Sequence, residues 1–307
     1  MRVLILSFGL MLLLFGCVGT PETGTPQETA EPAAPSEEPE GEAVDIPVGE
    51  SGQAAAEAQE TEPETAETPP EPEPEPEVQE ENPLDEINHK ELKFDTKDGW
   101  EIYGTVYYSE TSPSTLIILI PMLGAERGSY DSLIPQLHEE APYADIIAMD
   151  MRGHGESTNI AEYTGFQTGD FRAMERDLDA VVAYFSVGRP SIDNYYIVGA
   201  SIGSSVGLDY AVKHGEVSKL VMISPGIEYQ GYDITEDAES YLHELYIMAA
   251  EEDSYSAATA STIYNICPSD TKEKKVYDET DAHGTDLFSA TEDYSEPAVD
   301  VIVKWIK

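Results

Sequence analysis

Short apolar runs alternate with amphipathic segments from about residue 90 to the end of the chain. The runs at 115–120 and 144–149 are almost continuously apolar, as expected of strands that are buried on both faces. Between residues 171 and 185 the apolar side chains instead recur at helical spacing. The predicted strands lie at 92–95, 103–108, 115–120, 144–149, 195–199, 219–223, 246–250 and 275–277. The predicted helices lie at 130–140 (interrupted by Pro135), 171–185, 205–214, 256–264 and 297–306. This alternation predicts an α/β fold with a mostly parallel sheet and helices on both faces. The Asp-Gly turn at 98–99 adds an antiparallel N-terminal hairpin.

The first residues differ from this pattern. One Arg is followed by an apolar block at 3–15, which is too short for a comfortable bilayer span and is typical of a signal peptide. The block ends in Gly16-Cys17, which resembles the lipobox of bacterial and archaeal lipoproteins. That resemblance implies a signal peptide at 1–17, with Cys17 lipidated as the mature N-terminus. A plain secretory signal or an uncleaved anchor is the alternative. Cys267 is the only other cysteine, so a lipidated Cys17 would leave no intrachain disulfide.

Residues 18–86 are rich in Glu, Pro, Thr, Ala and Gly, including a run of alternating Pro and Glu at 70–77. Such a segment cannot form a core, and its charges repel, so we expect a disordered and extended acidic tether. The tether would join a folded domain at 87–307 to a lipid anchor, placing that domain outside the cytoplasm at the cell membrane. A tail that binds basic partners or cations is the alternative interpretation.

The chain has a formal net charge of −45, and the tether does not account for all of it. From Leu92 onward the chain has 38 acidic and 14 basic side chains, which gives the predicted domain alone a formal net charge of −24. This charge argues against nucleic acid as a partner. The length from Leu92 to the end is sufficient for one domain with a good core.

A Gly-x-Ser-x-Gly sequence at 199–203 separates the predicted strand 195–199 from the predicted helix 205–214. Strand, sharp turn and helix in this order are typical of a nucleophile elbow. The turn holds the serine in a strained backbone conformation, and the two flanking positions must be small to avoid neighbouring elements. Ser201 is therefore the candidate nucleophile.

The order of elements, with this elbow after the third parallel strand, resembles the α/β-hydrolase superfamily. Residues 150–157 read Asp-Met-Arg-Gly-His-Gly-Glu-Ser and are similar to the Asp-x-Arg-Gly-His-Gly-x-Ser turn of many members. That turn is mostly structural in the family, so the resemblance implies that His154 shapes a loop and is not the catalytic base. Residues 98–104 resemble the opening hairpin of dienelactone-hydrolase-like and serine-aminopeptidase-like members.

The resemblance also implies a catalytic set, because the partners follow in the chain order Ser, acid, His. His283 lies in a glycine-containing loop after the last predicted strand, where the family has its base. His214 and His243 lie at less suitable places. Asp253 is the expected acid because it closes a segment similar to the family's Gly-x-x-Asp, with Glu252 as the alternative. The expected roles follow the triad mechanism, in which the base takes the serine proton and the acid orients the base.

The resemblance implies an oxyanion hole of two backbone N–H groups. One is expected from Ile202. The other is expected from the loop after 115–120, where many relatives have His-Gly and this chain has Ile120-Pro121-Met122. Because Pro121 has no N–H, Met122 is the expected donor. The remaining histidines are scattered, so no metal site is indicated, and no cofactor is implied.

Only about 20 residues separate the predicted strands 219–223 and 246–250, so a large lid has no room at its usual place. A minimal lid argues against a true lipase. The expected function is a serine hydrolase that cleaves an ester or thioester of a small or surface-presented acyl group through an acyl-enzyme on Ser201. A peptidase of the aminopeptidase-like type and a non-catalytic binding module are the alternatives. Four aromatic residues are expected either to form the pocket walls or to pack the domain: Tyr163, Phe166, Tyr229 and Tyr232.

Overall fold

The computed structural model describes residues 82–307. The predicted signal peptide, Cys17 and nearly all of the predicted tether lie outside these residues. The first described element is a 3₁₀ helix at Pro83–Glu86, whose Leu84 is buried. None of the helices from residue 82 onward is long and apolar enough to cross a membrane.

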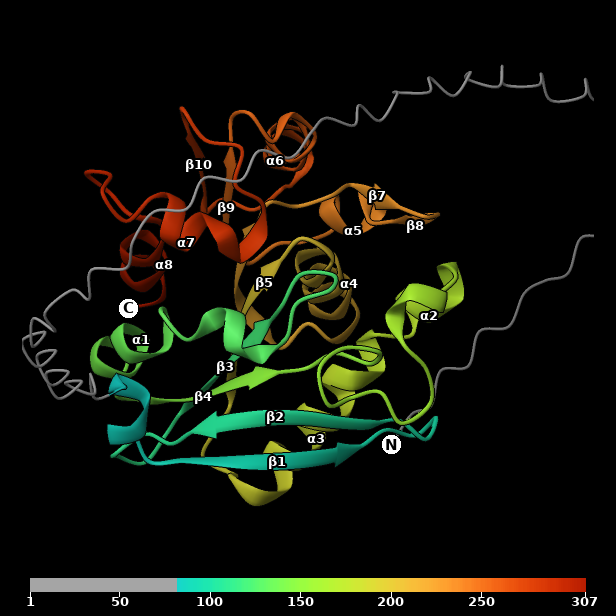
Figure 1. The fold of residues 1–307 in the computed structure, drawn as a ribbon, viewed down its shortest axis with the longest axis vertical. Coiled ribbons are helices and arrows are strands. Elements are labelled where there is room, and N and C mark those ends of the chain that lie inside the picture. Colours follow the sequence, from blue (N-terminus) through green and yellow to red (C-terminus); the bar gives the residue numbers. More distant parts are fainter. Residues whose placement is uncertain (1–81) are drawn as a thin grey trace, which may run out of the picture. The chain divides into compact units, whose positions relative to one another are not determined.

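The core of the domain is an eight-stranded sheet in the order β1-β2-β4-β3-β5-β6-β9-β10 (Figure 1). β1 pairs antiparallel with β2, and β2 pairs antiparallel with β4, while all other neighbours are parallel. The strands are β1 His89–Asp95, β2 Glu101–Tyr107, β3 Thr115–Ile120, β4 Ala144–Met149, β5 Asn194–Ala200, β6 Val217–Ile223, β9 Glu244–Ala250 and β10 Lys272–Tyr277. The predicted mostly parallel sheet with an antiparallel N-terminal hairpin is confirmed.

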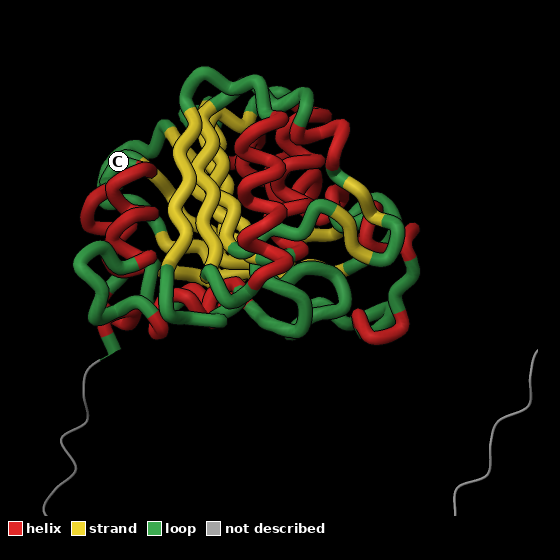
Figure 2. Tube along the Cα trace, turned by 90° about the horizontal axis from the view of Figure 1, so that it is seen from above, coloured by secondary structure: helices red, strands yellow, loops and turns green. Residues whose placement is uncertain are grey.

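Helices cover both faces of this sheet, as Figure 2 shows. The helices are α1 Ile134–Glu140, α2 Thr168–Arg172, α3 Glu175–Gly188, α4 Ile202–His214, α5 Thr235–Ala238, α6 Ser254–Ile266, α7 Leu287–Ala290 and α8 Ala298–Ile306. The apolar residues of α3, α4 and α6 pack with Leu116, Ile118 and Ile120 of β3 on one face. Those of α1, α7 and α8 pack with Ile117 and Leu119 on the other. β3 is apolar throughout because both of its faces are buried.

Two predicted helices begin at other residues in the structure. Instead of a helix over 130–140, a 3₁₀ helix at Arg127–Tyr130 precedes α1, and Pro135 lies in the first turn of α1. Proline is tolerated there because the N–H groups of the first turn have no intrahelical acceptor. The helix after the candidate nucleophile begins at Ile202 rather than at residue 205, directly behind Ser201.

A small hairpin, which the sequence pattern did not predict, occupies the usual place of a lid between β6 and β9. β7 (Glu228–Tyr229) pairs with β8 (Tyr232–Asp233), and the short helix α5 follows. Gln230 and Gly231 both have positive φ, 48° and 80°, as in a two-residue type I′ turn. The chain therefore has the expected minimal lid.

Candidate active site

Ser201 lies in a strained turn between β5 and α4. Its φ is 49° and its ψ is −116°, which is rare for a residue that is not glycine. Its N–H donates to the carbonyl of Ile223 at the end of β6, over 2.8 Å. The turn thus projects the residue from the carboxyl end of the sheet, where loops after the parallel strands meet.

The two glycines of the elbow are required by close backbone contacts. A Cβ at Gly199 would lie 2.4 Å from the carbonyl oxygen of Gly203. A Cβ at Gly203 would lie 2.4 Å from the carbonyl oxygen of Ile120 and 2.6 Å from that of Pro121. The second contact places α4 directly against the loop that follows β3, so the spacing of the elbow and this loop depends on Gly203.

Gly203→Ala is therefore expected to lower the free energy of unfolding by about 1–3 kcal/mol, as overpacked cores do. The matched control is Gly188→Ala at the end of α3, where nothing lies within 4 Å of an added Cβ. Urea unfolding of both variants measures the difference. Equal stabilities of the two variants would contradict the close packing at Gly203.

The structure brings the three predicted side chains together in series. Nε2 of His283 lies 2.7 Å from Oγ of Ser201. Nδ1 of the same ring lies 2.7 Å from Oδ2 of Asp253. Asp253 follows β9 and caps the N-terminus of α6, while His283 lies in the loop after β10. Three loops, distant in sequence, thus supply a hydroxyl, an imidazole and a carboxylate within hydrogen-bonding distance.

The alternative residues lie elsewhere. Glu252 is exposed, and His283 is hydrogen-bonded to Asp253, the residue after Glu252. His214, at the end of α4, stacks on Tyr210, and its Nε2 lies 3.5 Å from an oxygen of Asp179. His243 precedes β9 and meets Tyr241 edge-on. None of the three lines the cavity that contains Ser201.

The electrostatics of Asp253 favour its ionised form. Burial acts to raise the pKa of this carboxyl, but hydrogen bonds from Ser256 and His283, together with the charge of His283, outweigh burial and lower the pKa below its usual value. An ionised carboxylate only accepts hydrogen bonds, so Nδ1 of His283 must carry the proton that it shares with Asp253. When the ring carries only this proton, Nε2 presents its lone pair to the Ser201 hydroxyl.

Neither predicted oxyanion donor has a protein acceptor among residues 82–307. Ile202 is the first residue of α4, so its N–H has no acceptor in a preceding turn. The N–H of Met122 donates to no protein group within residues 82–307. The Met122 carbonyl accepts from Ala125 over 3.1 Å, which closes a turn around Gly124. Their role as an oxyanion hole stays a prediction.

A cavity of about 230 Å³ contains the reacting atoms in its wall. It is lined by Leu123, Ser201, Ile202, Ser205, Gly226, Tyr229, Tyr255, Ser256 and His283. Four of these residues contribute large apolar or aromatic side chains to the wall: Leu123, Ile202, Tyr229 and Tyr255. Tyr255 was not singled out from the sequence, although it stands only two residues after Asp253, in the first turn of α6. We refer to this space as the small cavity.

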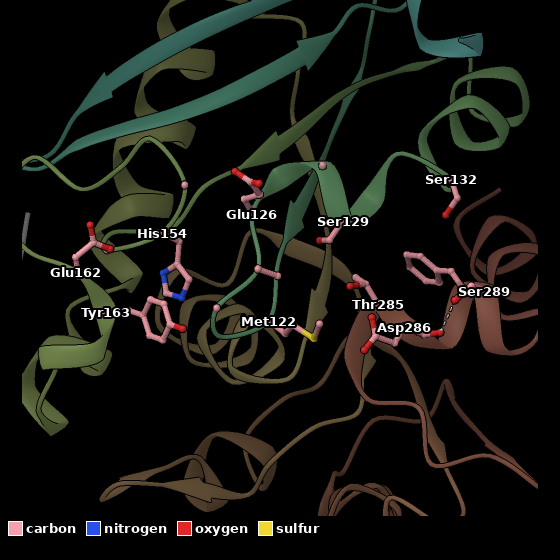
Figure 3. A pocket seen from close by; sticks show the side chains of 16 residues that line it. Met122, Glu126, Ser129, Ser132, His154, Glu162, Tyr163, Thr285, Asp286 and Ser289 are labelled. Atoms are coloured by element: carbon pink, nitrogen blue, oxygen red, sulfur yellow. Dashed lines mark hydrogen bonds between the residues drawn. The ribbon is translucent and has the colours of Figure 1, made fainter. Parts of the chain in front are cut away.

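A second, larger cavity of about 670 Å³ lies beside the loop that carries Met122 (Figure 3). Three carboxylates line it, those of Glu126, Glu162 and Asp286, and no lysine or arginine does. The side chain of Met122 borders it and packs against Gly284, the neighbour of His283. The charged side chains that line the larger cavity are therefore all acidic.

The four aromatic residues left open by the sequence divide between the two expected places. Tyr229 lines the small cavity and Tyr163 lines the larger one. Phe166 and Tyr232 are buried in the core, where Phe166 contacts Trp100 edge-on.

His154 and Arg152 shape the loop after β4. His154 is 2 % exposed, stacks on Tyr163, and places Nδ1 3.0 Å from the carbonyl of Arg152. Burial lowers the pKa of the His154 ring, which keeps it neutral. Arg152 is buried and binds Asp177 and Asp98 through its guanidinium nitrogens, at 2.7 and 2.9 Å. His154 has no contact with Ser201 among the hydrogen bonds of the described chain, in keeping with a loop residue.

No group of three or more His, Cys, Asp or Glu side chains that could hold a metal ion occurs among residues 82–307.

Comparisons with known proteins agree with this architecture. Residues 115–252 match the family described as "alpha/beta hydrolase fold". A solved esterase of Pyrococcus furiosus shares 18 % identity at a TM-score of 0.59, covering 75 % of this chain and 94 % of its own. A highly thermostable carboxyl esterase from Bacillus coagulans shares 15 % identity at a TM-score of 0.56, and the match covers 72 % of this chain and 98 % of the esterase. An esterase from Exiguobacterium antarcticum shares 15 % identity at a TM-score of 0.53, and the match covers 71 % of this chain and 99 % of the esterase. A search of the curated proteins gives no match. The family match over residues 115–252 and the likeness to these solved structures show that this chain has an α/β-hydrolase fold.

Proposed function

We propose that this protein is a serine hydrolase that cleaves carboxylic esters through an acyl-enzyme on Ser201. The observation that carries the proposal is the unbroken series from Ser201 through His283 to Asp253, with both hydrogen-bond distances at 2.7 Å. A serine hydroxyl is a weak nucleophile unless an adjacent base takes its proton. The esterase neighbours have the same fold, which supports ester cleavage as the first reaction to test.

The reaction would proceed in two halves. Oγ of Ser201 attacks the carbonyl carbon while Nε2 of His283 takes the hydroxyl proton, and the N–H groups of Ile202 and Met122 stabilise the oxyanion. The imidazolium, held by Asp253, then protonates the departing alkoxide, which leaves as an alcohol. A water molecule attacks the acyl-enzyme, giving its proton to His283, and the carboxylic acid is released as Ser201 regains its proton.

The charge around the site bears on the leaving group. The larger cavity presents three carboxylates and no lysine or arginine beside the Met122 loop. A leaving group that carries phosphates would be repelled there. We therefore place uncharged esters first, and thioesters of uncharged thiols second. The sequence of residues 1–17 supports placing this activity outside the cytoplasm, on a lipid anchor at Cys17.

Labelling with a fluorophosphonate probe tests the proposal directly. Such a probe reacts only with a serine that a neighbouring base activates. We expect the full chain to be labelled once, and peptide mapping to locate the label at Ser201. A folded chain that takes no label would instead support a binding module on a hydrolase fold.

A further inference from the structure

The small cavity suits an apolar group. Leu123 and Ile202 form part of its wall, and two tyrosine rings form another part. The Ser205 hydroxyl, which also faces this space, is already bound to the carbonyl of Gly226 over 3.1 Å. A hydrocarbon chain therefore gains free energy by entering the cavity, because burial of apolar surface is favourable.

The ring of Tyr255 is held in place across this cavity. Its hydroxyl donates to the carbonyl of Glu228 over 2.7 Å and accepts from the N–H of the same residue over 3.2 Å. The ring packs against Gly226, where a Cβ would lie 3.3 Å from it. Two hydrogen bonds thus fasten α6, through Tyr255, to the first strand of the β7–β8 hairpin.

The hairpin is also fastened on its other side, by α2. Thr168 donates to the carbonyl of Gln230 over 2.5 Å, and Arg172 donates to that of Gly231 over 3.2 Å. The ring of Tyr229 meets Phe171 edge-on, with 5.3 Å between centroids. Because the hairpin is tied on both sides, the positions of Tyr229 and Tyr255 are fixed by contacts outside the cavity itself.

We propose that the small cavity binds the acyl part of the substrate and that Tyr229 and Tyr255 restrict it to short acyl chains. The proposal rests on the proposed function and names the substrate class of the same site. Its physical basis is volume: about 230 Å³ is less than the roughly 300–1,000 Å³ of pockets that hold drug-sized ligands. A short chain fills such a space, and a longer one meets a tyrosine ring.

A series of p-nitrophenyl esters tests the acyl limit on the full chain. With acetyl, butyryl, hexanoyl, octanoyl and decanoyl esters, kcat/KM of the wild type is expected to rise by about fourfold per methylene at the short end, which is the value of burying one such group. Beyond hexanoyl it is expected to fall. Tyr255→Ala removes a ring from the wall and is expected to move the maximum to octanoyl or decanoyl.

Two matched variants test whether the ring of Tyr255, and not another effect of the substitution, sets the acyl-chain limit. Tyr255→Phe loses the two hydrogen bonds to Glu228 but retains the ring and its packing against Gly226, so its maximum is expected to stay with the short esters. Tyr264→Ala makes the same truncation on the same helix, at a residue outside the cavity that lies beside Lys272 and Lys274. Its maximum is also expected to stay. A maximum that does not move in Tyr255→Ala, or a wild type that accepts decanoyl as well as butyryl, would overturn the proposal.

Fluorophosphonates with ethyl and octyl chains separate this proposal from the function on which it rests. Faster labelling of Ser201 by the ethyl probe, with the difference reduced in Tyr255→Ala, supports both. Equal labelling by the two probes in the wild type contradicts the acyl limit and leaves the hydrolase proposal intact. Labelling by neither probe, in a chain with intact circular dichroism, contradicts both.

Discussion

Ser201→Ala is expected to lower kcat for p-nitrophenyl butyrate by about a million-fold, the size of the loss when a serine hydrolase loses its nucleophile. The reason is that Oγ of Ser201 is the atom that His283 activates, over 2.7 Å, and no acyl-enzyme can form without it. The substitution removes one oxygen and leaves the turn and the oxyanion donors in place. Steady-state turnover and fluorophosphonate labelling should therefore both disappear while the protein stays folded.

The control is a serine-to-alanine change at a distant residue. Ser261 lies on α6 and donates its hydroxyl to the carbonyl of Ala257 on the same helix. Ser261→Ala is expected to hydrolyse the ester at the wild-type rate. If Ser201→Ala retained that rate as well, the nucleophile would have to lie elsewhere, and the mechanism above would be wrong.

Asp253→Asn is expected to lower kcat by about ten-thousand-fold, as loss of the acid does in serine hydrolases with a triad. The carboxylate accepts the Nδ1 proton of His283 and stabilises the imidazolium that forms during attack. An amide can instead donate to Nδ1, which would place the ring proton on Nε2, facing Ser201. Initial rates at neutral pH measure the loss, and an unchanged KM would show that the substrate still binds.

The neighbouring acid supplies the matched control. Glu252→Gln makes the same chemical change one residue away, at an exposed side chain that does not contact His283. We expect it to retain wild-type activity. A large loss in Glu252→Gln together with an active Asp253→Asn would assign the acid to Glu252 instead.

Much of the sheet could be predicted because its central strands are buried on both sides. β3 and β4 have the predicted boundaries, since a strand covered by helices on both faces appears in the sequence as one short apolar run. The candidate side chains at 201, 253 and 283 could be named from the sequence, because the elbow indicates the first and the resemblance to the α/β-hydrolase superfamily implies the other two. Their meeting at 2.7 Å could only come from the structure.

Other elements could not be predicted because their short sequences contain too little of the pattern that identifies a strand or a helix. β7 and β8 have two residues each, so no alternation of apolar and polar positions can develop. The start of α1 was misplaced because Pro135 is compatible both with an interrupted helix and with a new first turn. The place of Tyr255 in the cavity wall depends on its hydrogen bonds to Glu228, which lies 27 residues earlier in the sequence. A contact over this distance cannot be predicted from the local pattern of apolar and polar residues.

The β7–β8 hairpin lies outside the central sheet, and its turn at Gln230-Gly231 is exposed. Extra residues inserted at this turn would extend outward from the hairpin that carries Tyr229, without shifting any strand of the central sheet. The entropic cost of such an insertion grows slowly with its length, by roughly 0.6 kcal/mol for each doubling. The tip of this hairpin is therefore the point at which evolution, or an engineer, could graft a larger cap and so change which substrates enter, while the catalytic residues stay untouched.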